Sequence, residues 1–222
     1  MTATAITQVG ALLADATRAS LLEVLMDGRA RTGGELARSV GVAPSTASEH
    51  LSRLLDARFV AVEAQGRHRY FRLAGSDVAE LLEALGAREP AGDRVATGAP
   101  AELVHARSCY DHLAGRLAVR IHDRMVAAGY LGHAHDHPYL TDSGAELLAG
   151  LGVDLAAARD RRRPLVRDCL DWTERRHHLA GAAGAALFAT LLERGWLARG
   201  SRPRSVRVTT AGQRGLADAF GV

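Results

Sequence analysis

The stretch that decides the fold is TGGELARSVGVAPSTASEHLSRLLDARFVAVEAQGRHRYFRL, from Thr32 to Leu73. Thr32 and Glu35 have the spacing of a capping box, in which each side chain accepts a bond from the other's backbone N–H, so a helix is expected to begin here. Gly41 marks the end of that helix. Pro44 then fits the first position of a second helix, where a missing N–H costs nothing. The pattern predicts two short helices across a tight turn.

The second predicted helix has one apolar and one polar face. Its apolar residues recur at helical spacing, and they are Ala47, Leu51, Leu54 and Leu55. Short polar and charged side chains suit the major groove of DNA, where a recognition helix meets base edges. The candidates for such contacts are Ser45, Thr46, Ser48, Glu49, Ser52 and Arg53, with His50 between the two faces.

A β-hairpin is predicted after the second helix. The β-favouring runs 59–63 and 68–73 flank a turn that contains Gly66, which places Arg67, His68 and Arg69 at its tip. A basic tip suits phosphates or the minor groove. An isolated helix pair is common in α-rich proteins, but this order of helix, turn, polar helix and arginine-tipped hairpin favours DNA binding.

These segments resemble the ArsR/SmtB family of bacterial transcription regulators. The resemblance rests on LADATRASLLEVL (13–25), APSTASEHLSRLLDA (43–57) and GRHRYFRL (66–73), and covers about the first 85 residues. It implies a homodimeric repressor of double-stranded operator DNA, released by an effector, with Ser45, Thr46, Ser48 and His50 near the operator. It also implies a dimer interface between the first and last helices of the domain. Apolar residues available for that interface are Ala11, Leu12, Leu13, Val78, Leu81, Leu82 and Leu85.

The chain departs from the family at two metal sites that many of its members use. The segment 34–41 contains no cysteine, and the helix predicted over 76–85 contains no histidine. Neither of those two family metal sites is therefore expected in this protein.

Composition bounds the remaining expectations. The chain has 222 residues, 47% of them hydrophobic, which is enough for two domains. No apolar run is long enough to cross a membrane and no basic segment opens a leader, so we expect a cytoplasmic protein that does not enter membranes. All basic side chains except the histidines are arginines. Residues 1–90 contain ten arginines and eleven acidic residues, and residues 91–222 contain eighteen arginines and fourteen acidic residues. DNA affinity must therefore come from local placement of arginines.

The predicted organisation is a winged helix-turn-helix over 1–86, a linker over 87–101 and an effector domain over 102–222. The effector domain contains an internal repeat, about 109–150 and 169–222, in which HLAG is followed after thirteen residues by a glycine, an aromatic residue and leucine. Each copy predicts a long helix, a small wing and a short helix that begins after Thr141 or Thr209. The expected fold class is mainly α with small β-wings, that is, α+β.

The effector domain holds the candidate sensing residues. Cys109 and His112 lie three apart on a predicted helix, and Cys169 precedes the neighbouring pair His177 and His178. If the repeats pack about a pseudo-two-fold axis, a metal ion could be bound by Cys109, His112, Cys169 and one of these histidines, of which His178 is the candidate. The two cysteines could instead form a thiol redox pair. Two buried, structural cysteines are the alternative.

Two other features of the effector domain are weaker candidates. An organic effector could lie among Tyr110, Tyr130, Trp172 and Trp196. The alternating histidines 133, 135 and 137 are expected in an exposed turn between two strands.

The sequence therefore predicts a DNA-binding regulator with an unknown effector. A thiol- or metal-responsive sensor is the alternative, and an RNA- or protein-binding winged helix is less favoured. No phosphate-binding loop, nucleophile elbow, zinc-protease motif or dinucleotide fingerprint occurs, so we expect no enzyme.

Overall fold

A computed structural model describes residues 3–86, 100–134, 137–160 and 163–222. The chain divides into two compact units, Met1–Leu82 and Glu83–Val222. The linker predicted over 87–101 lies mostly outside the described residues. In the described part, no helix is both long and apolar enough to span a bilayer.

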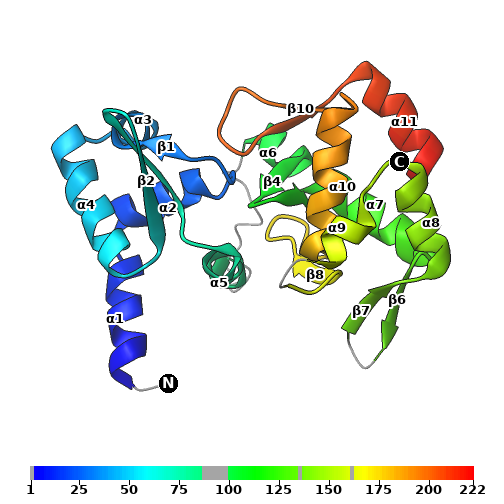
Figure 1. Ribbon diagram of the computed structural model, residues 1–222, viewed down its shortest axis with the longest axis horizontal. Coiled ribbons are helices and arrows are strands. Elements are labelled where there is room, and N and C mark those ends of the chain that lie inside the picture. The colour runs from blue at the N-terminus through cyan, green and yellow to red at the C-terminus, as the bar shows by residue number, and fades with distance from the viewer. Residues whose placement is uncertain (1–2, 87–99, 135–136, 161–162) are drawn as a thin grey trace. The chain divides into compact units, whose positions relative to one another are not determined.

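The first unit is a winged helix-turn-helix (Figure 1). In chain order its elements are α1 (Ala3–Leu13), α2 (Ala16–Leu25), β1 (Arg31–Thr32), α3 (Gly33–Val40), α4 (Pro44–Asp56), β2 (Val60–Gln65), β3 (His68–Leu73) and α5 (Ser76–Gly86), whose last turn belongs to the second unit. The strands form one antiparallel sheet in the order β1-β3-β2. Leucines from α2, α3 and α4 fill the core.

The predicted signals at the helix-turn-helix are confirmed. Thr32 and Glu35 form the capping box at the start of α3, and Gly41 ends that helix with a left-handed φ of 76°. Pro44 occupies the first turn of α4. The hairpin turn is tighter than predicted, because Gln65 still pairs with His68 and leaves only Gly66 and Arg67 between the strands.

The second unit consists of two copies of one motif. The first copy contains β4 (Arg107–Cys109), β5 (His112–Ala114), α7 (Arg116–Ala127), β6 (Leu131–Ala134), β7 (His137–Leu140) and α8 (Asp142–Gly150). The second contains β8 (Arg167–Leu170), β9 (His177–Ala180), α10 (Gly181–Glu193), β10 (Leu197–Arg199), β11 (Val206–Val208) and α11 (Thr210–Phe220). The short helices α6 (Ala101–His105) and α9 (Leu155–Arg159) precede and follow the first copy. The predicted α+β fold with two helix-plus-wing repeats is confirmed.

The two copies agree in their local chemistry. Gly115 directly precedes α7 and Gly181 is the first residue of α10, and both have a positive φ, of 88° and 79°. Thr141 and Thr209 accept hydrogen bonds from the backbone N–H of Gly144 and Gly212, and so cap α8 and α11. One hydrophobic core, shared by both copies, includes Leu117, Ile121, Met125, Leu187 and Leu191.

Each copy also begins with a hairpin that the sequence analysis missed. Cys109 and His112 were predicted on a helix, and this prediction is wrong, because they face each other across the β4–β5 hairpin. Tyr110 in the intervening turn has φ of 56°, which a right-handed helix does not allow. The two strands have three residues each, too few for alternation of polar and apolar residues to be recognised.

Candidate functional site

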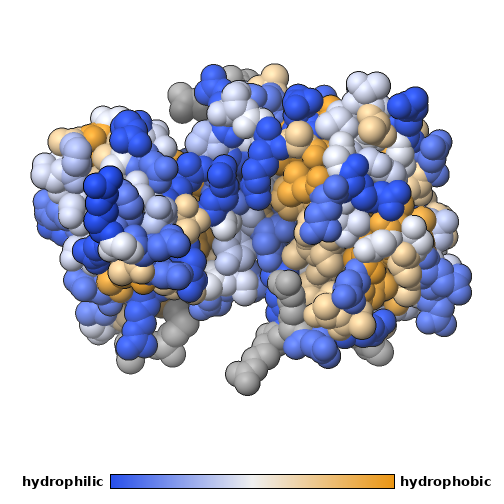
Figure 2. Space-filling model, turned by 45° about the horizontal axis from the view of Figure 1, so that its top comes forward, coloured by the Kyte–Doolittle hydropathy of each residue, from blue (hydrophilic) through white to orange (hydrophobic). Residues whose placement is uncertain are grey.

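Helix α4 carries the first candidate site, a polar surface suited to DNA. Ala47, Leu51 and Leu54 are fully buried, which fixes the orientation of the helix in its unit. The opposite face is open to solvent at Ser45, Ser48, Glu49, Ser52 and Arg53, with Thr46 half-buried. Arg53 donates a hydrogen bond of 2.6 Å to Glu49 one turn earlier. Hydrophilic side chains predominate on the visible face of this unit, on the left of Figure 2.

His50 differs from the other candidates on α4. Its side chain is only 14% exposed, and its Nδ1 lies 3.3 Å from the guanidinium of Arg18 and 3.6 Å from Asp15. The imidazole thus faces α2 within the unit. His50 is less accessible to DNA than its neighbours on the helix.

The hairpin β2–β3 carries the second group of DNA candidates. Arg67 and Arg69 are both exposed, and Arg67 lies in the turn itself. The guanidinium of Arg69 lies 5.5 Å from the centre of the Phe71 ring, which limits the positions open to this cation. The wing therefore presents positive charge on a short, hydrogen-bonded support.

Apolar side chains are exposed on α1 and α5. Ile6 is 58% exposed on α1, and Leu81 and Leu85 are 39% and 47% exposed on α5. Val78 on α5 is instead buried. These two helices are the ones for which an interface with a second chain was expected.

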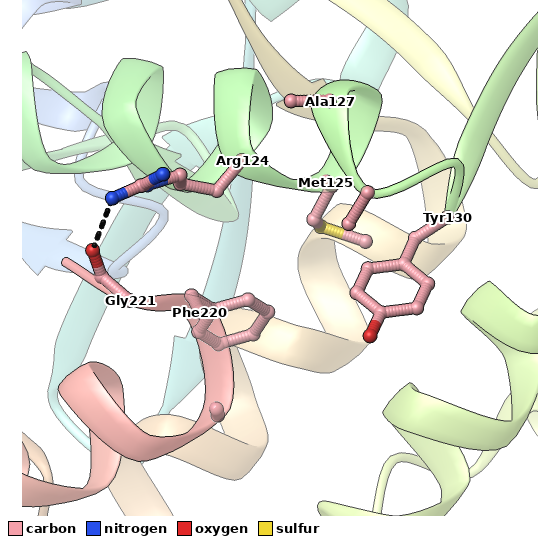
Figure 3. Close-up of a pocket in the computed structure, with 8 residues that line it drawn as sticks. Arg124, Met125, Ala127, Tyr130, Phe220 and Gly221 are labelled. Carbon is pink, nitrogen blue, oxygen red and sulfur yellow. Dashed lines mark hydrogen bonds between the residues drawn. The ribbon is translucent and has the colours of Figure 1, made fainter.

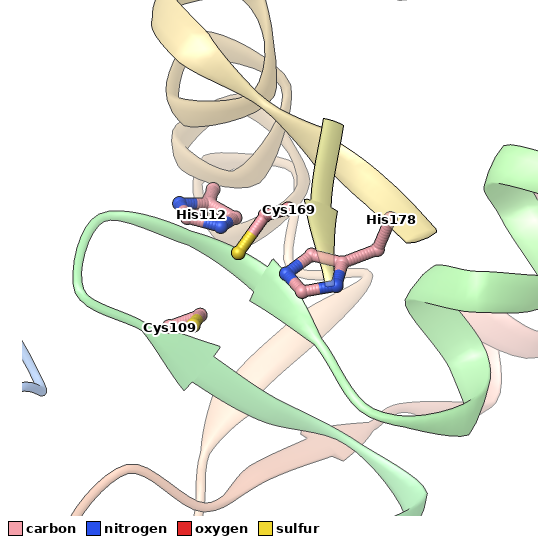
Figure 4. Close-up of side chains that lie close together, drawn as sticks. All are labelled: Cys109, His112, Cys169 and His178. Atoms are coloured by element: carbon pink, nitrogen blue, oxygen red, sulfur yellow. The ribbon is translucent and has the colours of Figure 1, made fainter. Parts of the chain in front are cut away.

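In the second unit, two cysteines and two histidines converge between the hairpins β4–β5 and β8–β9 (Figure 4). We call Cys109, His112, Cys169 and His178 the Cys/His cluster. One ligand atom from each side chain lies within 4.8 Å of all the others, and all four residues are buried. The internal repeat in the sequence predicts that these four residues converge. His177 on the same strand is exposed and does not join them.

The two thiols also contact a carboxylate. Glu83, the first residue of the second unit, lies 2.6 Å from the Cys109 sulfur and 3.1 Å from the Cys169 sulfur. Burial, and then the charge of Cys109, raise the pKa of Glu83 to about 8. The hydrogen bond from Cys169 is the main cause that holds the pKa of Cys109 well below its usual range, and the same bond raises the pKa of Cys169.

The two histidines of the cluster stack on each other, with ring centres 5.1 Å apart. Burial alone would lower the pKa of His112, but the neighbouring side chains of Asp111 and Cys109 raise it to about 10. Burial lowers the pKa of His178. The cluster therefore already combines a low-pKa thiol with one imidazole that burial keeps neutral, and both are competent donors to a metal.

Carboxylates that the sequence analysis did not use stand behind both histidines. Asp111 lies 3.4 Å from Nδ1 of His112, and Asp171 lies 3.8 Å from Nδ1 of His178. Both aspartates stand two residues after a cysteine, in the phrases CYDH and CLDW. This repeated Cys-x-Asp spacing was the signal in the sequence that could have identified them.

Asp171 also ties the two repeats together. It is fully buried, and it accepts bonds from the Arg107 guanidinium at 2.8 Å and from the Gly115 backbone N–H at 2.7 Å. Burial opposes its charge, but Arg107 lowers the pKa of Asp171 to about 2. The carboxylate is thus held in place by a network that lies at the start of both copies.

His133, one histidine of the predicted His133 to His137 turn, is exposed and contacts the half-buried carboxylate of Asp168. β6 and β7 form the expected hairpin, with residues 135 and 136 outside the described part of the chain. His133 Nε2 lies 2.8 Å from one oxygen of Asp168, and His122 Nε2 lies 3.1 Å from the other. Although burial opposes it, these two histidines lower the pKa of Asp168.

A cavity of about 380 Å³ lies between α7 and the end of α11 (Figure 3). Met125, Tyr130 and Phe220 line it, and Arg124 donates a hydrogen bond of 3.2 Å to the carbonyl of Gly221 at its rim. Tyr130 is one of the four aromatic residues considered for an organic effector. Two others make separate contacts, since Trp172 stacks on Arg107 and Trp196 on Arg194.

The sequence is similar to a helix-turn-helix family model and to known transcriptional regulators. Residues 13–63 match a family model described as a helix-turn-helix domain. Over 211 residues the chain is 41% identical to the uncharacterized HTH-type transcriptional regulator YdfF of Bacillus subtilis, covering 94% of this chain and 93% of that protein. Over 82 residues it is 37% identical to the HTH-type transcriptional regulator CmtR of Mycobacterium tuberculosis, covering 37% of this chain and 69% of that protein.

Solved structures match over shorter parts of the chain. The homodimeric winged helix-turn-helix DNA-binding domain of Mb0332 from Mycobacterium bovis is 31% identical, covering 40% of this chain and 83% of that one, with a TM-score of 0.37. The cadmium metal-sensor CMTR from Mycobacterium tuberculosis is 35% identical, covering 42% of this chain and 94% of that one, with a TM-score of 0.32. The similarity to YdfF extends over both units.

Proposed function

This chain belongs to the ArsR/SmtB-type winged helix-turn-helix transcriptional regulators, and from that premise we propose that it is a homodimeric repressor of a pseudo-palindromic operator. The observation that carries the proposal is the exposed polar face of α4 beside an arginine-tipped wing. One recognition helix per chain reads one half-site, so a dimer is needed for two half-sites. The exposed leucines of α5 and Ile6 of α1 supply apolar surface for that dimer.

Base contacts are assigned to the outer face of α4 and phosphate contacts to the wing. Serine and threonine hydroxyls can donate to or accept from base edges, whereas arginines such as Arg67 neutralise phosphates without reading sequence. The first unit is almost neutral overall, so a few arginines and the doubling by a partner chain must supply the electrostatic attraction.

The experiment that tests this role is a binding measurement on the protein's own promoter. Purified full-length protein is titrated against labelled promoter DNA and against random DNA of equal length, while light scattering gives its mass. We expect a dimer with a preference for the promoter of at least about a thousandfold at moderate salt. A monomer that binds both DNAs equally would contradict the proposal.

A second role, as a sensor, is favoured by the Cys/His cluster of the second unit. We propose that the effector enters through this unit and that binding at the cluster releases the protein from DNA, which makes the regulator metal- or thiol-responsive. The cavity beside Tyr130 supports the alternative of an organic effector. Cys109→Ser and Cys169→Ser are expected to prevent derepression in cells. Normal derepression in both variants would assign the cysteines a structural role.

A further inference from the structure

We propose that the Cys/His cluster is a closed, four-coordinate site for a borderline-soft divalent cation of the Zn(II) class, with one thiolate and one imidazole from each repeat. The inference deepens the sensing role proposed above and depends on that role only for its biological meaning. The site itself follows from the geometry of the two hairpins.

Each hairpin presents its two ligands side by side. Cys109 is paired with His112 across β4 and β5, and Cys169 is paired with His178 across β8 and β9. Directly opposite residues in an antiparallel pair have Cβ atoms about 4.5–5.5 Å apart, so each hairpin supplies a preformed two-ligand arm. Strands β5 and β9 lie beside each other, which brings the two arms together (Figure 4).

The distances suit a small cation. Zn–S bonds of about 2.3 Å and Zn–N bonds of about 2.0–2.1 Å put tetrahedral ligand atoms about 3.3–3.8 Å apart. The four ligand atoms of the cluster lie within 4.8 Å of one another. The longest separation therefore has to shorten by about 1–1.5 Å for the four atoms to share one cation.

Unsatisfied nitrogens in the cluster point to a missing ligand. His112 Nε2 and both ring nitrogens of His178 are buried and lack a hydrogen-bond partner among the described residues. A buried polar atom left without a partner is destabilising, because it gives up its hydrogen bonds to water and gains none in return. Coordination of a cation by Nε2 of His112 and by one nitrogen of His178 would satisfy two of these three atoms.

Asp111 determines which nitrogen of His112 is free to bind. It lies 3.4 Å from Nδ1, so Nε2 is the remaining nitrogen of that ring, and a carboxylate in this place orients metal-binding imidazoles in proteins. Asp171 lies 3.8 Å from Nδ1 of His178, beyond hydrogen-bond distance, so both nitrogens of that ring are open to a cation. Arg163 and Arg107 hold the two carboxylates at 2.8 Å each.

The donor set decides the class of cation. Two sulfurs and two imidazoles favour Zn(II), Cd(II) and Co(II), whereas Mg(II) and Ca(II) require oxygen ligands. Two thiolates balance the charge of a dication, so the buried site would carry no net charge. All four ligand residues are buried, which leaves no open position of the kind that a catalytic zinc site keeps.

Cobalt titration of the full-length protein, without DNA, tests the inference. We expect one Co(II) per chain, with the sulfur-to-cobalt charge-transfer band and the visible bands of tetrahedral Co(II), and displacement by one equivalent of Zn(II). His178→Asn should lower the affinity at least tenfold. His177→Asn changes the neighbouring exposed histidine of the same strand and should leave the affinity unchanged.

Two further variants keep all four ligands and so distinguish a loss of metal affinity from a loss of the fold. Asp111→Asn keeps all four ligands and should lower the affinity about 10- to 100-fold while one Co(II) still binds. Glu83→Gln also keeps them and should retain the tetrahedral spectrum. Folded wild-type protein that binds no Co(II), a spectrum without sulfur bands, or equal losses in His177→Asn and His178→Asn would overturn the inference. Operator binding is measured separately on the same samples, so a failure of either proposal is seen on its own.

Discussion

At the scale of residues, we expect the two arginines of the wing to contact phosphates and the serines of α4 to contact base edges. Arg67→Ala should weaken binding to promoter and random DNA alike and lower the slope of log affinity against log salt by about one per chain. The reason is that a phosphate contact releases a counterion but reads no base. Anisotropy titrations at several salt concentrations measure this.

The matched control for that variant is Arg214→Ala, which removes the same charge from an exposed position on α11. It should leave the salt slope unchanged. If the two variants lowered the slope equally, the effect would be one of net charge and the wing would have no special part in it.

Ser48→Ala belongs to the same scale but should change sequence preference. A lost hydroxyl contact to a base edge costs about 1 kcal/mol, or roughly fivefold, on the preferred operator and little on random DNA. Selection of binding sites from a randomised pool shows the change directly. If the variant selected the same consensus sequence as the wild type, Ser48 would not be a residue that contacts a base.

At the scale of elements, the capping box of α3 links sequence to stability. Bonds from the backbone N–H and then the hydroxyl of Thr32 hold the pKa of Glu35 below its usual value of 4.5. A lowered pKa means that the charged carboxylate stabilises the fold above that value and loses this effect as the pH falls through the lower, folded-state pKa. The gap in unfolding free energy between wild type and Glu35→Ala should therefore be largest near neutrality and shrink in acid.

The junction of hairpin and helix in each repeat gives a second prediction at this scale. A Cβ on Gly115 would lie 2.9 Å from the carbonyl oxygen of Val104, and the φ of 88° is itself strained for alanine. Gly115→Ala should cost about 2–3 kcal/mol of unfolding free energy in urea. Gly129→Ala, with φ of 73° but open space, should cost about 1 kcal/mol. Equal costs would mean that the close carbonyl has no effect.

Elements also show why sequence reasoning succeeded in one unit and was incomplete in the other. Thr32, Gly41 and Pro44 are local signals, since each acts on backbone groups within four residues, and the helices they predict are present. The hairpins β4–β5 and β8–β9 lack such signals. Their strands are short, and the second loop has six residues where the first has two, so their equivalence appears only once both are paired.

At the scale of the whole molecule, the repeat explains how distant residues could be grouped before the fold was known. Cys109 and His178 are far apart in sequence, and only the expectation of two related halves predicted that they meet. The reason given for the first pair, a shared helix face, was wrong, while the grouping itself agrees with the structure. Glu83 was missed because its importance depends on burial and on its distance from the two sulfurs, which no local pattern indicates, whereas the repeated Cys-x-Asp spacing could have identified Asp111.

The most direct measurement of the central claim is operator affinity during a Zn(II) titration of the full-length protein. In the wild type, one equivalent per chain is expected to weaken operator binding at least tenfold, a coupling of about 1.4 kcal/mol, while His178→Asn remains bound and His177→Asn behaves as wild type. Operator affinity that stays constant in the wild type while zinc fills the site would contradict the claim that this site controls DNA binding.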